Sequence, residues 1–131
     1  MHGTLVTIGR ILLGLFFVVL GLAKVKGVFD SGSLAGLAGY IGSRGLPQPQ
    51  ILAAATIAFE VLGGLALIFG FFTTPIAFLM AGFCLATAAF FHNFWTFPAE
   101  QTIPQFQNFM KNIALTGAYL VLAGEGIRSK I

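Results

Sequence analysis

The sequence predicts an all-α membrane protein, a bundle of four antiparallel transmembrane helices built as a single domain over residues 1–131. The chain is 57% hydrophobic and only 8% charged, and its mean hydropathy is +0.94. A soluble domain has about 25% charged residues, so this chain has too few polar residues to cover a water-soluble globule. Four apolar stretches approach the roughly 20 residues that a helix needs to cross the hydrocarbon core.

The first stretch covers residues 4–23. At 100° per residue, one face of this helix carries a basic residue near each end and two glycines: Arg10, Gly14, Phe17, Gly21 and Lys24. Glycines on a charged face predict that this face meets another helix closely. Lys24 ends the stretch, so the alternative is that its ammonium simply extends to water. A signal peptide is not expected, because no basic residue precedes the stretch and three more stretches follow.

Residues 24–49 are predicted to be a loop that contains a short amphipathic helix, residues 33–43, lying in the membrane interface. Its apolar residues recur at helical spacing: Leu34, Leu37, Ala38 and Ile41. The segment Gly45 to Pro49 ends this helix and leads into the second stretch.

The second stretch, residues 50–72, carries Glu60 near its middle. Thr56, Gly63, Gly64 and Leu67 share its helical face. A charge at this depth costs roughly 2.5–3.5 kcal/mol, so an intramembrane carboxyl is a functional candidate. We expect Glu60 to face the bundle interior, either protonated or paired with a cation. A pair could serve only to fix helix register, or the carboxyl could handle protons or bind a ligand.

The third stretch covers residues 75–92 and the fourth residues 106–124, with a polar loop over residues 93–105 between them. Thr74 suits an N-cap and Pro75 the first helical position. We therefore expect a tight turn before the third helix, which makes the second and third helices adjacent and antiparallel.

Polar residues gather where the third and fourth stretches approach each other. His92, Asn93 and Trp95 follow the third stretch, and Lys111 and Asn112 lie in the first turns of the fourth. The alternatives are that His92 caps its helix and that Trp95 is an ordinary residue of the interfacial aromatic belt.

The predicted topology brings one set of polar residues to the same side of the membrane: Lys24, His92, Trp95, Lys111 and Asn112. Glu60 would lie about ten residues, or roughly 15 Å, from that side. Arg10 enters from the opposite side and leans away from Glu60, so a direct contact between them requires a tilt or an extended rotamer. We expect a polar intramembrane pocket with Glu60 at its floor. The Lys and Arg residues of the two sides are too evenly divided to predict orientation.

Several functions are not expected. The basic residues are scattered rather than clustered as nucleic-acid binding requires. Cys84 and two distant histidines do not make a metal site. The sequence has no haem, flavin or iron–sulfur motif, so a redox role would need a diffusible quinone or a partner protein.

Taken together, the motifs resemble the DoxX family of small bacterial membrane proteins. The resemblance rests on five segments: R-x-x-x-G-x-x-F followed by G-x-x-K (Arg10 to Lys24), G-L-P-x-P (Gly45 to Pro49), E-x-x-G-G-x-x-L-x-x-G (Glu60 to Gly70), H-N-F-W (His92 to Trp95) and F-M-K-N (Phe109 to Asn112). It implies a four-helix bundle in the inner membrane. Members of the family have been linked to quinone-coupled sulfur oxidation and to complexes that handle oxidative or thiol stress, while many have no assigned activity.

Two hypotheses for function follow. In the first, a quinone-like or other amphipathic molecule binds an aromatic-lined pocket, as part of an oxidoreductase or stress-response system. The residues of this pocket or buried polar network would be Arg10, Lys24, Glu60, His92, Asn93, Trp95, Lys111 and Asn112. In the second, the protein is a membrane scaffold or assembly factor, and the charges only fix helix packing. No catalytic residue is assigned.

Transport is a third option, although four spans without repeats are few for a carrier. Separately, the small residues in the third stretch suit a homodimer.

Overall fold

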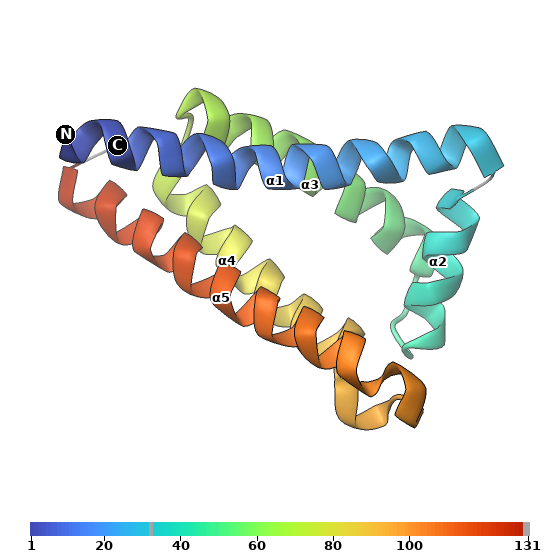
Figure 1. The fold of residues 1–131 in the computed structure, drawn as a ribbon. Coiled ribbons are helices and arrows are strands. Elements are labelled where there is room, and N and C mark those ends of the chain that lie inside the picture. The colour runs from blue at the N-terminus through green and yellow to red at the C-terminus, as the bar shows by residue number, and fades with distance from the viewer. Residues whose placement is uncertain (32, 130–131) are drawn as a thin grey trace. The chain divides into compact units, whose positions relative to one another are not determined.

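The computed structural model describes residues 1–31 and 33–129. Helices make up nearly all of this part of the chain, and no strand occurs within it (Figure 1). The chain divides into two compact units, Met1–Phe72 and Thr73–Ile131. The all-α prediction is confirmed, and each unit is considered in turn.

The first unit contains α1 (His2–Ser31), α2 (Ser33–Ser43) and α3 (Pro49–Phe69). Figure 1 shows α1 lying along α3, with α2 joining them. The short helix over residues 33–43 is confirmed. The loop predicted to begin at residue 24 is wrong over its first part, because α1 continues to Ser31. The polar residues after Lys24 lower hydropathy, but no proline interrupts the helix there.

The second and third apolar stretches are separated by a turn at Gly70–Phe72. Gly70 and Phe72 have left-handed backbone angles, with φ of 80° and 52°, and α4 (Thr73–Phe91) begins at once. The predicted turn at Thr73–Pro75 is therefore wrong by a few residues. Gly70 caps α3 in the conformation that glycine adopts without a steric penalty.

The second unit contains α4, a 3₁₀ turn η1 (Phe94–Thr96) and α5 (Ala99–Ser129). The polar loop predicted over residues 93–105 is wrong from Ala99 onward. Pro104 lies inside α5 without ending it. A proline there removes one hydrogen bond to a carbonyl four residues earlier, and that carbonyl belongs to the exposed Glu100.

Three segments are long and apolar enough to cross a membrane: His2–Lys24, Pro49–Phe69 and Thr73–Thr96. They match the first three predicted spans. α5 is not among them, because its strongly apolar part begins only at Ile113. The structure therefore supports a helical membrane protein with three candidate spans.

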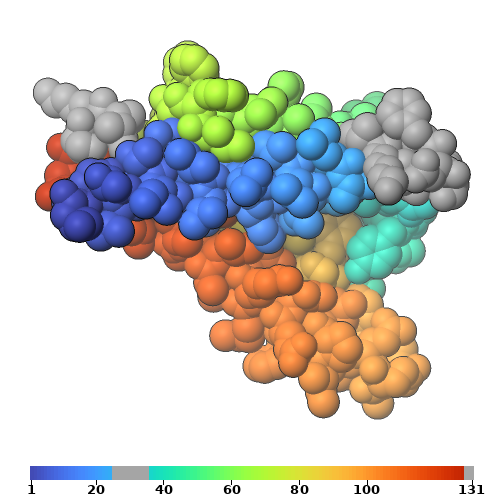
Figure 2. Space-filling model, turned by 45° about the horizontal axis from the view of Figure 1, so that its top comes forward, coloured from blue at the N-terminus to red at the C-terminus, as the bar shows by residue number. Residues whose placement is uncertain are grey.

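The atoms of α1 form a continuous blue row in Figure 2, and exposed apolar side chains recur along this helix. These residues are Leu5, Ile8, Leu12, Leu15, Val19 and Leu22. Such a surface suits contact with lipid rather than with water.

Candidate functional site

The charged face of α1 is the face that packs against α3. A Cβ added to Gly14 would lie 2.6 Å from the carbonyl oxygen of Gly64, and a Cβ added to Gly64 would lie 2.6 Å from that of Gly14. The two backbones therefore touch, as glycines permit between membrane helices. The prediction that this face of α1 meets another helix is confirmed.

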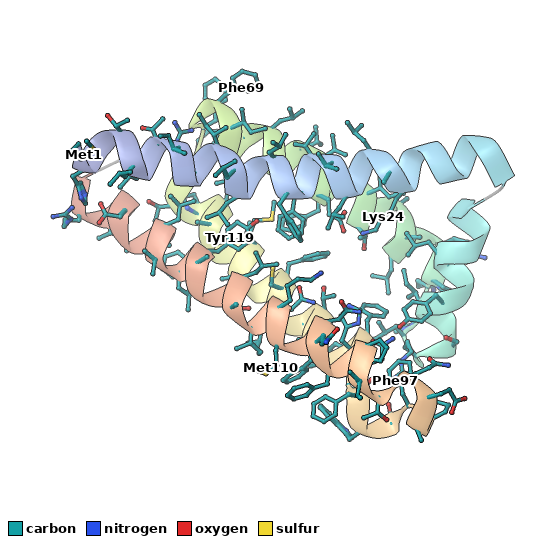
Figure 3. The ribbon with its side chains drawn as sticks, in the orientation of Figure 1. Met1, Lys24, Phe69, Phe97, Met110 and Tyr119 are labelled. Atoms are coloured by element: carbon teal, nitrogen blue, oxygen red, sulfur yellow. The ribbon has the colours of Figure 1, made fainter. Side chains whose placement is uncertain are left out.

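Glu60 forms an ion pair with Lys24 across this contact. The ammonium of Lys24 donates to Oε1 of Glu60, which is 1% exposed near the middle of α3. Gly21 makes room for the pair, because a Cβ there would lie 3.2 Å from the Cβ of Glu60 and 2.6 Å from Val61 Cγ2. Figure 3 shows Lys24 on the side of α1 that overlies α3.

The direction of the two helices explains why Lys24 is the partner of Glu60. Helical side chains lean toward the N-terminus of their own helix. Because α1 and α3 run antiparallel, Lys24 and Glu60 lean toward each other, whereas Arg10 leans away from Glu60. Of the two alternatives for Glu60, the structure favours pairing with a cation.

Arg10 instead caps the C-terminal end of α3. Its Nη1 donates to the carbonyl of Leu67 and, at 3.0 Å, to that of Ile68. The last carbonyls of a helix have no intrahelical donor, and a cation there is favoured by the helix dipole. A Cβ added to Gly70 would lie 3.1 Å from Nη1, so this glycine also leaves space for the guanidinium.

The second carboxylate oxygen of Glu60 lacks a hydrogen-bond donor among the described residues. Its Oε2 is buried and has no hydrogen-bond partner within the described chain. A buried polar atom without a partner costs about 1–3 kcal/mol and calls for an explanation. The side chain of Lys24 is 34% exposed, against 2% for that of Glu60. The pair thus has a buried acceptor, Oε2 of Glu60, without a donor in the described chain, and a cation, Lys24, that is still accessible from outside the helix pair.

In the second unit, His92 links the end of α4 to α5. Its Nδ1 lies 2.7 Å from Oε1 of Gln105, so the two side chains hydrogen-bond between α4 and α5. Its backbone N–H donates to Ala88 at 3.3 Å. The side chain of His92 thus bonds to α5, and the capping alternative stays a prediction. Gln105 was missed by the sequence analysis, although it falls on the same helical face as Asn112 and Thr116.

One face of α5 carries a polar stripe that contacts α4. The hydroxyl of Thr116 donates to Asn112 of its own helix at 2.8 Å and to the carbonyl of Ala81 on α4 at 3.4 Å. The amide of Asn112 donates to Asn108 at 3.1 Å, and Tyr119 is fully buried. The stripe is therefore a set of neutral hydrogen bonds within the second unit, while Lys111 is exposed.

Asn93 and Trp95 lie in the connection between α4 and α5. The carbonyl of Asn93 accepts from the backbone N–H and the hydroxyl of Thr96, both at 2.9 Å. Trp95 is 62% exposed and packs edge-on against Phe94 and Phe109, at centroid distances of 5.2 and 5.8 Å.

The structure thus groups the predicted site residues by unit. Lys24 and Glu60 meet near the middle of α3, and Arg10 bonds to the C-terminal end of the same helix. His92, Asn93, Trp95, Lys111 and Asn112 belong to the second unit. A single pocket that joins all of them stays a prediction.

Comparison with known proteins agrees with the resemblance drawn from the motifs. The DoxX family model matches residues 5–93. The chain is 35% identical to the inner membrane protein YphA of Escherichia coli over 93% of the chain and 83% of that protein. It is 34% identical to the inner membrane protein YqjF of the same organism over 92% of the chain and 83% of that protein. No solved structure matches the chain. The chain therefore belongs to the DoxX family and is a multi-pass protein of the bacterial inner membrane.

Proposed function

We propose that this DoxX-family protein is a single-domain, four-span bundle that binds an amphipathic small molecule at the Lys24–Glu60 pair. The observation that carries the proposal is the buried Oε2 of Glu60, which has no partner within the described chain. An acceptor at the middle of a membrane helix is a functional candidate by default. A ligand that donates to it would remove the cost of leaving it unpaired.

The chemistry of the pair defines the ligand class. An ionised carboxylate only accepts hydrogen bonds, so the ligand must present an O–H or N–H group to Oε2. The ammonium of Lys24 has three donors, one of which serves Oε1. A second could reach a hydroxyl or carbonyl oxygen of the same ligand. A quinol-like ring with an apolar tail meets both requirements and can enter from the bilayer, and a redox role would then depend on a partner oxidoreductase.

The fourth span of the proposal is α5. Two of its polar residues, Gln105 and Thr116, are hydrogen-bonded to α4. Its exposed side carries an apolar stripe: Ile103, Phe106, Met110, Leu120, Val121 and Ile127. Average hydropathy therefore understates how apolar the outer surface of α5 is. With 31 residues, or about 46 Å, the helix is long enough to cross.

Reporter fusions test the fourth span. A reporter that is active on only one side of the inner membrane would be fused after Pro98 and, separately, after the last residue. We expect the two fusions to report opposite sides. The same side for both would contradict a spanning α5, without bearing on the Lys24–Glu60 pair.

Mass spectrometry of small molecules that remain with the protein in mild detergent tests the ligand. Wild type would be compared with Glu60→Gln and with the matched control Glu125→Gln, whose carboxylate pairs with Arg128 at 3.1 Å. We expect a stoichiometric amphipathic molecule in wild type and in the control, and its loss in Glu60→Gln. Bulk phospholipid alone in all three would contradict ligand binding.

A scaffold function is the second candidate, and a specific observation favours it. Arg10 and the Gly14–Gly64 contact hold α1 against α3 without leaving any group available for a ligand. On this reading Lys24 and Glu60 fix the register of the same helix pair. The extraction experiment separates the two candidates.

A further inference from the structure

Four aromatic side chains form a cluster at the connection between α4 and α5. Phe94 lies at its centre, with ring centroids 5.0 Å from Phe106, 5.6 Å from Phe109 and 5.2 Å from Trp95, all edge-on. Such contacts add about 0.5–1.5 kcal/mol per pair beyond burial. The cluster is nevertheless open to its surroundings, since Trp95 is 62% and Phe106 45% exposed.

The first turns of α5 continue this apolar surface. Ile103 and Met110 are 69% and 47% exposed, and Figure 3 shows Met110 on the outer side of α5. Four polar residues occupy the other side of the same turns: Gln101, Gln105, Asn108 and Asn112. This two-sided pattern is typical of helices that lie at a membrane surface.

Chain continuity places the cluster at one end of a membrane span. The candidate span Thr73–Thr96 ends in η1, so Trp95 lies at its boundary. Trp95 also contacts Phe109, which is two residues, or about 3 Å along the axis, from the exposed Lys111. From Lys111 to Arg128 is 17 residues, or about 26 Å, close to the roughly 30 Å of the hydrocarbon core. The two basic residues therefore suit the two boundaries of α5.

We propose that the aromatic cluster is seated in the headgroup layer of the bilayer and anchors the α4–α5 connection there, at the level of Trp95 and Lys111. The occupant of this exposed surface is lipid. An indole ring has an apolar body and a polar N–H, which is why tryptophan collects at membrane interfaces. The span proper then begins near Lys111, and the turns of α5 before it lie outside the hydrocarbon core. This inference rests on α5 as the proposed fourth span, and it does not depend on the ligand proposed for Glu60.

Trp95 is the only tryptophan of the chain, so its fluorescence reports on this position alone. The protein would be reconstituted into phosphatidylcholine vesicles whose acyl chains carry bromine either close to the headgroup or near the chain end. We expect stronger quenching by the shallow bromines than by the deep ones, and weak quenching by aqueous iodide. Strong iodide quenching without bromolipid quenching, stronger quenching by the deep bromines, or no quenching by either agent would each overturn the proposal. The last result would mean that protein covers the indole.

A variant pair tests whether the cluster holds Trp95 at this depth. Phe94→Leu removes the central ring but keeps the tryptophan. Phe78→Leu removes an exposed aromatic ring elsewhere on α4 and serves as the matched control. We expect a red-shifted emission maximum and increased iodide quenching in Phe94→Leu, with the wild-type profile in Phe78→Leu. Identical profiles in both variants would contradict an anchoring role for the cluster.

Discussion

The two helix pairs of this protein are held together by different chemistry. α1 and α3 meet through touching backbones at Gly14 and Gly64, with a cation at each end of the contact. α4 and α5 meet through neutral side chains, with Gln105 and Thr116 donating or accepting across the interface. In the α1–α3 pair, Arg10 binds backbone carbonyls of α3 and Lys24 binds the carboxylate of Glu60. Lipid cannot solvate these polar groups. Arg10, Lys24 and Glu60 therefore serve first to hold α1 against α3.

The largest expected effect comes from removing one member of the Lys24–Glu60 pair. Lys24→Met leaves the carboxylate of Glu60 buried without a cation, and stranding a buried charge costs about 3–5 kcal/mol. The double variant Lys24→Met/Glu60→Gln should recover much of this loss. Thermal unfolding in detergent of both single variants and the double variant checks it, and additive effects would mean that the two residues do not interact.

The second-largest effect should come from the contact between Gly14 and Gly64. Gly64→Ala places a Cβ 2.6 Å from the carbonyl of Gly14, which is backbone and cannot turn aside. Overpacking of this kind costs about 1–3 kcal/mol, so the midpoint of unfolding should fall. On α4, a Cβ at Gly82 would meet no atom of the described chain within 4 Å. Gly82→Ala should be neutral or slightly stabilising, and an equal loss in both variants would mean that α1 and α3 are not in contact.

The cap of α3 by Arg10 should matter less. Arg10→Gln removes a cation from a helix C-terminus, an interaction that contributes up to about 2 kcal/mol when partly buried. Arg10→Lys should retain part of that stability. The free energies of unfolding of the two variants are the measurement, and a stable Arg10→Gln would show that the carbonyls of Leu67 and Ile68 find other donors.

The smallest effect is expected at alkaline pH. It arises from Tyr40 in α2, which lies outside the candidate spans. Burial raises the pKa of Tyr40 above its usual value of 10.0, and Arg44 opposes the shift. The folded state therefore holds this proton more tightly than the unfolded state. The resulting stability is fully present below pH 10 and is lost as pH rises through the higher folded pKa. Tyr40→Phe should show a weaker alkaline loss of stability, and identical profiles would contradict the shift.

The sequence predicted correctly those features that depend on one face of a single helix. The pattern from Arg10 to Lys24 predicted which side of α1 meets a neighbour, and Glu60 was correctly expected inside. The partner of Arg10 was not predictable in the same way, because it depends on where α3 ends and on the left-handed turn at Gly70. That end was misplaced by a few residues.

The first turns of α5 were missed for a different reason. Residues 99–105 are polar on average, and this average polarity predicted a loop. Their polar and apolar residues nevertheless alternate with helical periodicity, which places Gln105 against His92 and leaves Ile103 exposed. A test of periodicity instead of mean hydropathy would have found this helix, and it would have named Gln105 as the partner on α5.

The Lys24–Glu60 contact requires Glu60 to be an ionised, paired carboxylate inside the membrane. Infrared spectroscopy of wild type and Glu60→Gln at neutral pH can decide this, because protonated carboxyls and carboxylates absorb in separate bands. We expect the difference spectrum to show the loss of a carboxylate band in the variant. Loss of a protonated-carboxyl band instead would contradict the Lys24–Glu60 ion pair and favour a neutral carboxyl that handles protons.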